Sequence, residues 1–395
     1  MITAADIESR LAGLDEIGNG PDGFSRLSWT LAEAAARAWF EQQAERLGLA
    51  VERDRAGNLW ACPPVPAPWR AVGSHLDTVA GGGRYDGALG VACAFAVAGE
   101  LEAPVAVLSF ADEEGARFNT PTFGSRALVG RLDAAEVLTR VDAEGTTMAA
   151  AMRDAGLAPE GLAEASAGLG RLRSFLEIHI DQSRELDEAG LPVGIVTGLA
   201  GRLRVAVEIR GEADHAGTTR RGERRDAMAA AARLIVAAED LAPGSDFVVT
   251  PTRLLVEPNA LSTIAGEVRL WLDARAPAVA AVDDWLRSLT DAATRIAAER
   301  RVEIALATAS RSPGTPFDEG IRRALRDGVE SLGLPGREMV CFAGHDAGVL
   351  AERIPAGMLL VRNPTGVSHS PRENVDVADA AVAANALAAA WESLG

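Results

Sequence analysis

Residues 70–110 read RAVGSHLDTVAGGGRYDGALGVACAFAVAGELEAPVAVLSF, and this stretch decides the fold. Two short apolar runs, Arg70–Ser74 and Val105–Phe110, each end in a polar cluster and predict strands. Between them lies Gly90–Gly99, whose small apolar residues predict a buried helix. A strand, a helix and a strand in this order predict a β-α-β unit, in which the strands are parallel and ligands bind at their carboxyl ends. We therefore expect an α/β domain with a central, mostly parallel sheet and a site at its carboxyl edge.

Further segments extend this pattern on both sides. Residues 29–48 have the periodicity of an amphipathic helix, and Phe175–Ile180 predicts another strand. The alternation in Leu203–Arg210 predicts a half-exposed antiparallel strand. After this strand, the pattern predicts a helix at 226–240, strands at 246–256 and 266–275, a helix near 282–299 and a strand at 302–308. This order predicts a small α+β sandwich inserted into the larger domain. We interpret Pro313–Pro316 as the loop that leaves it, so the larger domain is expected at 1–202 and 313–395 and the insert at 203–312.

Composition excludes several classes of function. The 395 residues predict about two or three domains, and the formal net charge of −17 argues against a nucleic-acid binder. All 39 basic residues are arginine, which excludes Schiff-base lysines, the phosphate-binding lysine of a P-loop and a carbamylated-lysine metal site. The cysteines Cys62, Cys93 and Cys341 are scattered and predict buried thiols in a reduced compartment. Apolar runs shorter than the ~20 residues of a membrane span and a charged N-terminus predict a cytoplasmic protein without membrane association.

The five histidines all lie in short polar motifs. These are GSHLDTV (Gly73–Val79), EIHIDQ (Glu177–Gln182), ADHAGTT (Ala213–Thr219), AGHDA (Ala343–Ala347) and SHSPRE (Ser368–Glu373). A single histidine of this kind is more often structural, but five of five in such motifs favour a chemical role. His75 ends a predicted strand, and Asp77 can accept the second ring N–H that a metal-bound imidazole usually donates. Asp86 follows a glycine-rich turn and can project back to the same strand end.

Three consecutive carboxylates, Asp112 to Glu114, follow the next predicted strand. They are costly to gather without a cation, although a solvated acidic turn is the alternative. Together with His179 and His369, the sequence offers three imidazoles and two carboxylates as ligands, namely His75, Asp86, Glu114, His179 and His369. Mixed nitrogen and oxygen ligands favour Zn²⁺, with Mn²⁺, Co²⁺ or Ni²⁺ as alternatives, and five ligands suit two ions ~3.5–4 Å apart. Glu113 then remains as the general base for a bound water.

The motifs GSHLDT, YDG, DEEGARF, EIHIDQ, HAGTT and SHSPRE together resemble the hydantoinase/carbamoylase branch of the binuclear metallo-aminoacylase and carboxypeptidase superfamily. That branch includes N-carbamoyl-L-amino-acid hydrolases, β-ureidopropionases and allantoate amidohydrolases. The resemblance implies a catalytic domain with two metals, bridged by Asp86, and an inserted lid domain that also forms a homodimer. It implies that His215 stabilises the tetrahedral intermediate in the neighbouring subunit's site and that Arg275 binds the substrate carboxylate. It further implies a substrate contact for Gln182 and a supporting role for His345 and Asp346.

Some positions depart from the family pattern, and they cluster where substrate is expected. Ser183 stands in place of a glycine, Arg220 in place of a proline after HAGTT, and Ala265 in place of a proline in Asn259–Gly266. Ser262 replaces the asparagine that assists carboxylate binding, which leaves the exact substrate open.

The favoured interpretation is a binuclear amidohydrolase that cleaves a linear C–N bond in a small carboxylate-bearing substrate. The simplest substrate is an N-carbamoyl-L-amino acid, cleaved to the L-amino acid, CO₂ and ammonia. Allantoate-type, aminoacylase and dipeptidase activities are alternatives within the same class. A metal-dependent binding protein that has lost catalysis is the alternative from another class, and the presence of Glu113 argues against it.

Overall fold

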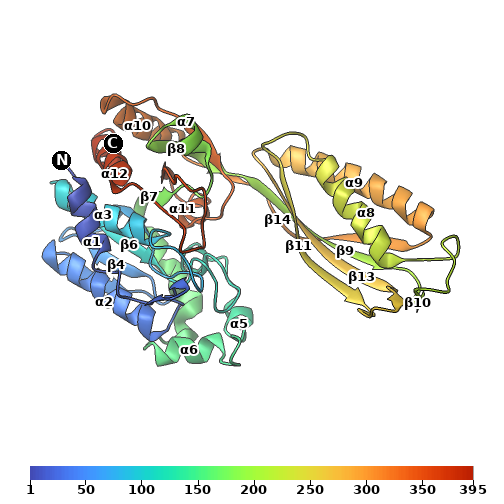
Figure 1. Cartoon of the computed structure of the whole chain (residues 1–395). Helices are drawn as coiled ribbons and strands as arrows, with labels where there is room; N and C mark the ends of the chain where they lie inside the picture. Colours follow the sequence, from blue (N-terminus) through green and yellow to red (C-terminus); the bar gives the residue numbers. More distant parts are fainter. Residues whose placement is uncertain (395) are drawn as a thin grey trace. The chain divides into compact units, whose positions relative to one another are not determined.

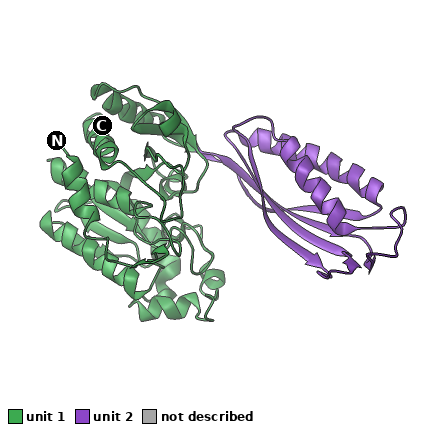
Figure 2. Cartoon of the chain, in the orientation of Figure 1, with its two compact units in different colours: residues 1–198, 316–395 green, residues 199–315 purple. Residues whose placement is uncertain are grey.

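The computed structural model describes residues 1–394 and contains two compact units (Figures 1 and 2). Unit 1 consists of Met1–Gly198 and Pro316–Gly395, and unit 2 is Leu199–Thr315. The sequence analysis predicted the inserted domain between the boundaries 202/203 and 312/313. The chain therefore leaves unit 1 once, forms unit 2, and returns.

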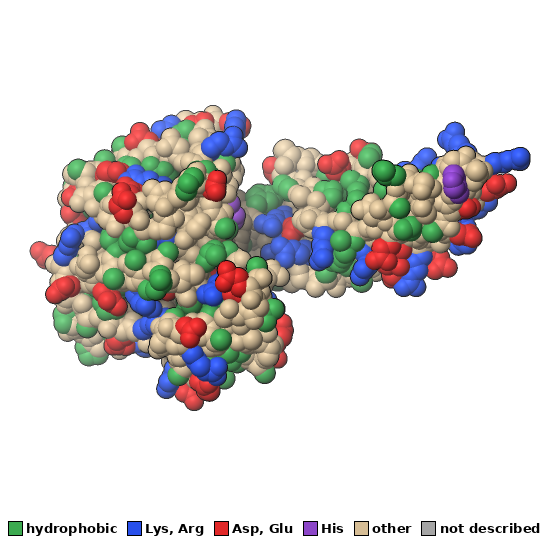
Figure 3. Space-filling model, turned by 60° about the horizontal axis from the view of Figure 1, so that its bottom comes forward, with side chains coloured by type: hydrophobic (Ala, Val, Ile, Leu, Met, Phe, Trp, Pro, Cys, Tyr) green, Lys and Arg blue, Asp and Glu red, His purple; other side chains and the backbone are tan. Residues whose placement is uncertain are grey.

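The surface carries charged side chains of both signs, as the face in Figure 3 shows. Within the described residues, no helix combines the length and the apolar character needed to cross a bilayer.

The main sheet of unit 1 is mixed. Its order is β15-β8-β17-β7-β5-β6-β4-β3, with β16 paired to β8. The strands are β3 (Ala50–Arg53), β4 (Leu59–Cys62), β5 (Trp69–His75), β6 (Ala106–Phe110), β7 (Leu172–Ile180), β8 (Val193–Leu199), β15 (Thr315–Pro316), β16 (Glu338–Cys341) and β17 (Ala356–Val361). The four central strands β17, β7, β5 and β6 are parallel, whereas β8 and β4 pair antiparallel at the flanks. The expected α/β class is confirmed, and the antiparallel flanks make the sheet less uniformly parallel than the β-α-β signal indicates.

Helices surround this sheet (Figure 1). They are α1 (Ala4–Leu11), α2 (Leu31–Arg46), α3 (Ala88–Glu100), α4 (Phe123–Leu128), α5 (Ala134–Val137), α6 (Met148–Asp154), the 3₁₀ segment η1 (Pro159–Arg171), α7 (Glu185–Ala189), α10 (Glu319–Ser331), α11 (Asp346–Leu350) and α12 (Val377–Trp391). A small hairpin of β1 (Asn19–Gly20) and β2 (Gly23–Phe24) precedes α2.

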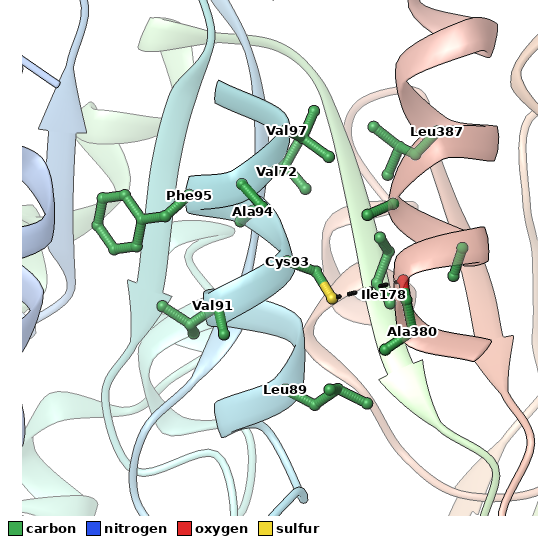
Figure 4. Close-up of a cluster of buried hydrophobic side chains, with 14 of the residues drawn as sticks. Val72, Leu89, Val91, Cys93, Ala94, Phe95, Val97, Ile178, Ala380 and Leu387 are labelled. Carbon is green, nitrogen blue, oxygen red and sulfur yellow. Dashed lines mark hydrogen bonds between the residues drawn. The ribbon is translucent and has the colours of Figure 1, made fainter. Parts of the chain in front are cut away.

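Helix α3 is the central buried helix, as its small apolar residues predict. It lies in the core with side chains from the sheet and from α12, and the Cys93 thiol donates a hydrogen bond to the Ala380 carbonyl at 3.9 Å (Figure 4). The approach of helix and sheet needs a glycine at one point, because a Cβ on Gly90 would lie 2.2 Å from the Ile178 carbonyl oxygen. The three cysteines are buried.

Unit 2 is a four-stranded antiparallel sheet with two helices on one face (Figure 1). The strand order is β11-β13-β9-β14. Its elements are β9 (Gly201–Arg210), β10 (Asp214–His215), α8 (Ala227–Asp240), β11 (Val248–Glu257), β12 (Thr263–Ile264), β13 (Glu267–Ala276), α9 (Val279–Arg300) and β14 (Glu303–Ser312). Alternate residues of β9, including Leu203 and Val205, pack with α8 and α9 in one core. The opposite face of the sheet carries Arg202, Arg204 and Glu208 of β9.

The interpretation of Pro313–Pro316 as a loop is wrong at its end. Gly314 adopts a positive φ of 82°, and Thr315–Pro316 then forms β15 at the edge of the main sheet. A two-residue edge strand containing proline has no periodicity that a sequence pattern can reveal, and an edge position tolerates the missing N–H.

Candidate metal centre

Four of the five predicted metal ligands lie at strand ends or in adjacent loops on one edge of the main sheet. His75 is the last residue of β5, Glu114 follows β6, and His179 is the penultimate residue of β7. Asp86 lies in the turn before α3. These neighbouring strands are parallel, so their carboxyl ends meet, which is why residues distant in sequence come together.

The fifth, His369, lies in the loop between β17 and α12, at a positive φ of 54°. Its side chain is half exposed, whereas the other four are buried or nearly so. Its Nε2 lies 3.3 Å from Glu114 Oε2 and 3.5 Å from Asp86 Oδ2.

Asp86 lies between two groups of ligands. Its Oδ1 is 3.4 Å from His75 Nε2 and 3.1 Å from His179 Nε2. Its Oδ2 faces His369, which in turn faces Glu114. The described residues thus form two donor sets that share Asp86, one with His75 and His179 and the other with Glu114 and His369.

The donor atoms fit divalent cations. Nδ1 of His75 lies 3.0 Å from the Asp77 carbonyl oxygen, and Nδ1 of His179 lies 3.1 Å from the Ile180 carbonyl oxygen. These contacts assign the ring proton to Nδ1, which leaves each Nε2 as a lone-pair donor. Within residues 1–394, both Nε2 atoms and Glu114 Oε1 are buried without a hydrogen-bond partner. Buried polar atoms without partners are costly, and bound ions would satisfy them.

Asp77 organises the neighbouring loop more than it orients His75. Its carboxylate is 3.6 Å from His75 Nδ1, farther than the Asp77 carbonyl, and it accepts the backbone N–H groups of Glu113 at 3.2 Å and Glu114 at 3.1 Å. Asp112 points elsewhere, because its Oδ1 accepts the Ser28 hydroxyl at 2.5 Å. The three consecutive carboxylates therefore do not act as one acidic turn.

Glu113 is buried beside the donor sets, with Oε2 3.9 Å from His75 Nε2. Burial raises its pKa well above the usual range, although the nearby His75 favours the charged form. Burial also raises the pKa of Glu114 to about 8. Burial opposes the charge of Asp86 as well, but His179 and His75 outweigh it and hold the pKa of that carboxyl well below its usual value. The pKa values of the carboxyl groups in this site are thus shifted in opposite directions, that of Asp86 downward and those of Glu113 and Glu114 upward.

Comparison with known proteins agrees with this geometry. The model of peptidase family M20/M25/M40 matches residues 50–393. The chain belongs to this family. It is 38% identical over 399 residues to an N-carbamoyl-L-amino acid amidohydrolase of Geobacillus stearothermophilus, covering 98% of this chain and 97% of that protein. It is 31% identical to an allantoate amidohydrolase of Bacillus subtilis, covering 95% and 93% of the two chains.

A solved structure extends the similarity to the whole fold. The chain resembles a hydantoinase/carbamoylase family amidase from Burkholderia ambifaria with a TM-score of 0.87 and 32% identity, covering 100% of this chain and 98% of that one. The resemblance inferred from the six motifs is confirmed, and the protein is a hydrolase of family M20.

In this M20 chain, Gln182 lies beside the donor sets. Its Nε2 donates to Asp86 Oδ2 at 3.0 Å, and Ser368 Oγ donates to the same oxygen at 2.9 Å. Gln182 therefore contacts the central carboxylate directly, and its contact with substrate stays a prediction.

The other predicted substrate residues lie in unit 2. His215, in β10, is exposed, and its Nδ1 accepts the backbone N–H groups of Gly217 and Thr218 at 3.0 and 3.2 Å. Ser262 is exposed beside it, since the Ala216 N–H donates to the Ser262 carbonyl at 2.8 Å. Arg275 lies on β13, where its Nε donates to Asp273 Oδ1 at 2.8 Å. The roles of His215, Ser262 and Arg275 toward substrate stay predictions.

His345 and Asp346 lie in unit 1 near His179. The ring centroids of His345 and His179 are 4.3 Å apart, and burial holds the pKa of His345 well below its usual value. Asp346 Oδ1 accepts the Ser125 hydroxyl, and Glu177 accepts the Ser74 hydroxyl and the Ala347 N–H. Glu177 was missed as a supporting residue, although it lies two residues before His179 on the same face of a strand, a spacing that could have indicated it.

Two further supporting residues were also missed. Glu373 Oε1 accepts the N–H groups of Tyr85 and Asp86 at 2.8 and 2.9 Å, and its place in the motif of His369 was the available signal. Arg26 is fully buried and donates from Nε to the carbonyl of Leu76, next to His75. No local pattern around Arg26 marks it, because a buried arginine and a surface arginine look alike in sequence.

Proposed function

We propose that this protein is a binuclear metal-dependent amidohydrolase that cleaves N-carbamoyl-L-amino acids to the L-amino acid, CO₂ and ammonia. The observation that carries the reaction type is the pair of donor sets sharing Asp86, with Glu113 beside them. The relative from Geobacillus stearothermophilus supports the substrate class.

Bound divalent ions at these donor sets would polarise the substrate carbonyl and lower the pKa of water. His75, Asp86 and His179 would hold one ion, and Asp86, Glu114 and His369 the other. Zn²⁺ is our first choice because the donors are imidazoles and carboxylates, with Mn²⁺, Co²⁺ and Ni²⁺ as alternatives.

Glu113 serves as the general base in this proposal. Its carboxylate takes a proton from the attacking water and returns it to the leaving amine nitrogen. Burial raises its pKa and so favours the protonated form, which is the form that returns the proton to the nitrogen. Asp77 keeps this carboxylate in place through the Glu113 backbone N–H.

His215 supplies the donor for the developing oxyanion. Since its Nδ1 accepts two backbone N–H groups, the neutral ring carries its proton on Nε2, the tautomer that donates outward. We propose that it acts in the site of a second subunit, so that the working enzyme is a homodimer. Arg275 would bind the substrate carboxylate, with Gln182 and Ser262 as additional contacts.

The test is a substrate panel with metal-loaded protein. The chelated protein is reconstituted separately with Zn²⁺, Mn²⁺ and Co²⁺ and incubated with N-carbamoyl-L-amino acids, allantoate, N-acetyl-L-amino acids and dipeptides. Ammonia release from the N-carbamoyl compounds supports the proposal. Amine release from N-acyl compounds without ammonia contradicts it, and no turnover with any metal favours a binding protein.

Allantoate is the second candidate, because the Bacillus subtilis relative is an allantoate amidohydrolase. It offers the same linear ureido group and carboxylate. Preferential ammonia release from allantoate in the same panel would select it.

A further inference from the structure

The helix-free face of the unit 2 sheet carries a cluster of arginine and serine side chains. In register, Arg202 of β9 lies opposite Arg275 of β13 and Ser312 of β14, and Arg204 lies opposite Asp273 and Ser310. Side chains alternate between the faces of a sheet, so these positions share one face. Leu203, between the two arginines, packs in the core under the helices, which places the cluster on the other side. Basic side chains gather on part of unit 2 in Figure 3.

The carboxylate of Asp273 pairs with two of the three arginines. Its Oδ2 accepts Arg204 Nε at 2.7 Å and its Oδ1 accepts Arg275 Nε at 2.8 Å. Arg202 has no such contact: in the described chain its Nε is buried without a hydrogen-bond partner. Ser310 Oγ, on the neighbouring strand, is buried and unpartnered in the same way.

This arrangement is unfavourable by itself. Like charges directly opposite one another in a sheet repel, and buried donors without acceptors lose their hydration. Burial lowers the pKa of Arg202, and the nearby Arg204 adds to that effect. An anion would remove both penalties, since a guanidinium binds a carboxylate through charge-assisted hydrogen bonds and a serine hydroxyl can donate to the same group.

We propose that Arg202 and Ser310 bind a second carboxylate of the substrate, beside the carboxylate assigned to Arg275. The preferred substrates are then N-carbamoyl derivatives of acidic L-amino acids. This inference rests on the proposed function. An apolar side chain would leave the Arg202 and Ser310 donors unsatisfied, and an amide would offer only a neutral acceptor, whereas an acidic side chain would supply a charged acceptor for the guanidinium.

Two matched substrate pairs test the specificity: N-carbamoyl-L-glutamate against N-carbamoyl-L-glutamine, and N-carbamoyl-L-aspartate against N-carbamoyl-L-asparagine. We expect kcat/KM of the natural protein to favour the acidic member by about tenfold or more in at least one pair. Arg202→Gln should bring that ratio close to one. The control Arg311→Gln, on the helix-covered face of β14 where Arg311 pairs with Asp283, should keep the ratio.

Two results overturn the inference. One is a natural protein that does not prefer the acidic member of either pair. The other is an Arg202→Gln variant in which kcat/KM falls in proportion for both members, because a purely structural role would leave the ratio unchanged.

A binding measurement separates this inference from the proposed function. Titration calorimetry with glutarate and butyrate should show the dianion binding the natural protein about tenfold more tightly, and Arg202→Gln should remove the difference. Retention of that difference in the variant counts against the carboxylate pocket. Another outcome is a protein that binds glutarate more tightly than butyrate through Arg202 and yet releases no ammonia from any N-carbamoyl compound. That result would contradict the proposed function but support the carboxylate pocket.

Discussion

The side chain of Glu113 differs from its neighbours in being close to the donor sets without belonging to either. Glu113→Gln preserves shape but removes the group that takes the proton, so kcat should fall by ~10²–10⁴. Metal content, measured by elemental analysis, should match that of the natural protein. Normal turnover in this variant would show that another group is the base.

Asp86 belongs to both donor sets, so its loss should affect both ions. Asp86→Ala should bind neither ion tightly, whereas Asp112→Asn should keep both because Asp112 faces Ser28. Equilibrium dialysis against Zn²⁺ measures this. Two tightly held ions in Asp86→Ala would contradict the shared-carboxylate model.

Asp112 should also influence the pH dependence of stability in the metal-free protein. Burial raises its pKa to about 8, far above the ~3.9 of an unfolded chain. Between these values the folded state keeps a proton that the unfolded state releases, so this group makes the free energy of unfolding decrease as pH rises from about 4 to about 8. Asn resembles the protonated acid, so Asp112→Asn should weaken this decrease in the free energy of unfolding. Urea titrations between about pH 4 and about pH 8 measure it. The same pH dependence in the variant and the natural protein would show that Asp112 is ionised in the folded state.

At the scale of elements, the contact between α3 and the sheet depends on a missing side chain. A Cβ at Gly90 would lie 2.2 Å from a backbone oxygen, which cannot move without disturbing β7. Gly90→Ala should therefore lower the free energy of unfolding by ~1–3 kcal/mol or more. Gly99→Ala on the same helix is the control, because its Cβ would meet only flexible side chains, Leu47 at 3.2 Å and Arg10 at 3.9 Å. Equal effects in denaturant titrations would show that close packing is not the reason.

Elements with strong periodicity were predictable from sequence, and edge elements were not. Composition and length were enough to predict the buried helix α3 and the strands β5, β6 and β7. Strands β3 and β15 are short and lie at the sheet margins, where burial imposes no clear pattern.

The residues of the candidate sites also divide into those that the sequence predicts and those that it does not. His75, Asp86 and His179 were foreseeable because each lies at or beside a strand end in a polar motif. The arginine cluster on unit 2 depends on the register between β9 and β13, which no local pattern gives. Sequence reasoning finds groups that share a motif more easily than groups that share a face of a sheet.

At the scale of the whole molecule, the proposed role of His215 joins two subunits. His215→Ala should be folded and metal-loaded but reduced in kcat by ~10²–10³. Mixing it with excess Glu113→Gln under subunit exchange should restore activity, because each mixed dimer has one site with both groups. Absence of recovery, with exchange proven by mass spectrometry of differently tagged chains, would place His215 in its own subunit's site or in a structural role.

The order of strands across the main sheet has a consequence for synthesis on the ribosome. Strand β17 fills the position between β7 and β8, yet it is made only after the whole of unit 2. A nascent chain can therefore complete the core of unit 2 while β7 and β8 still have unpaired edges, which are the features that promote aggregation. His369 follows β17, so the donor sets are completed only when nearly all of the chain has been translated.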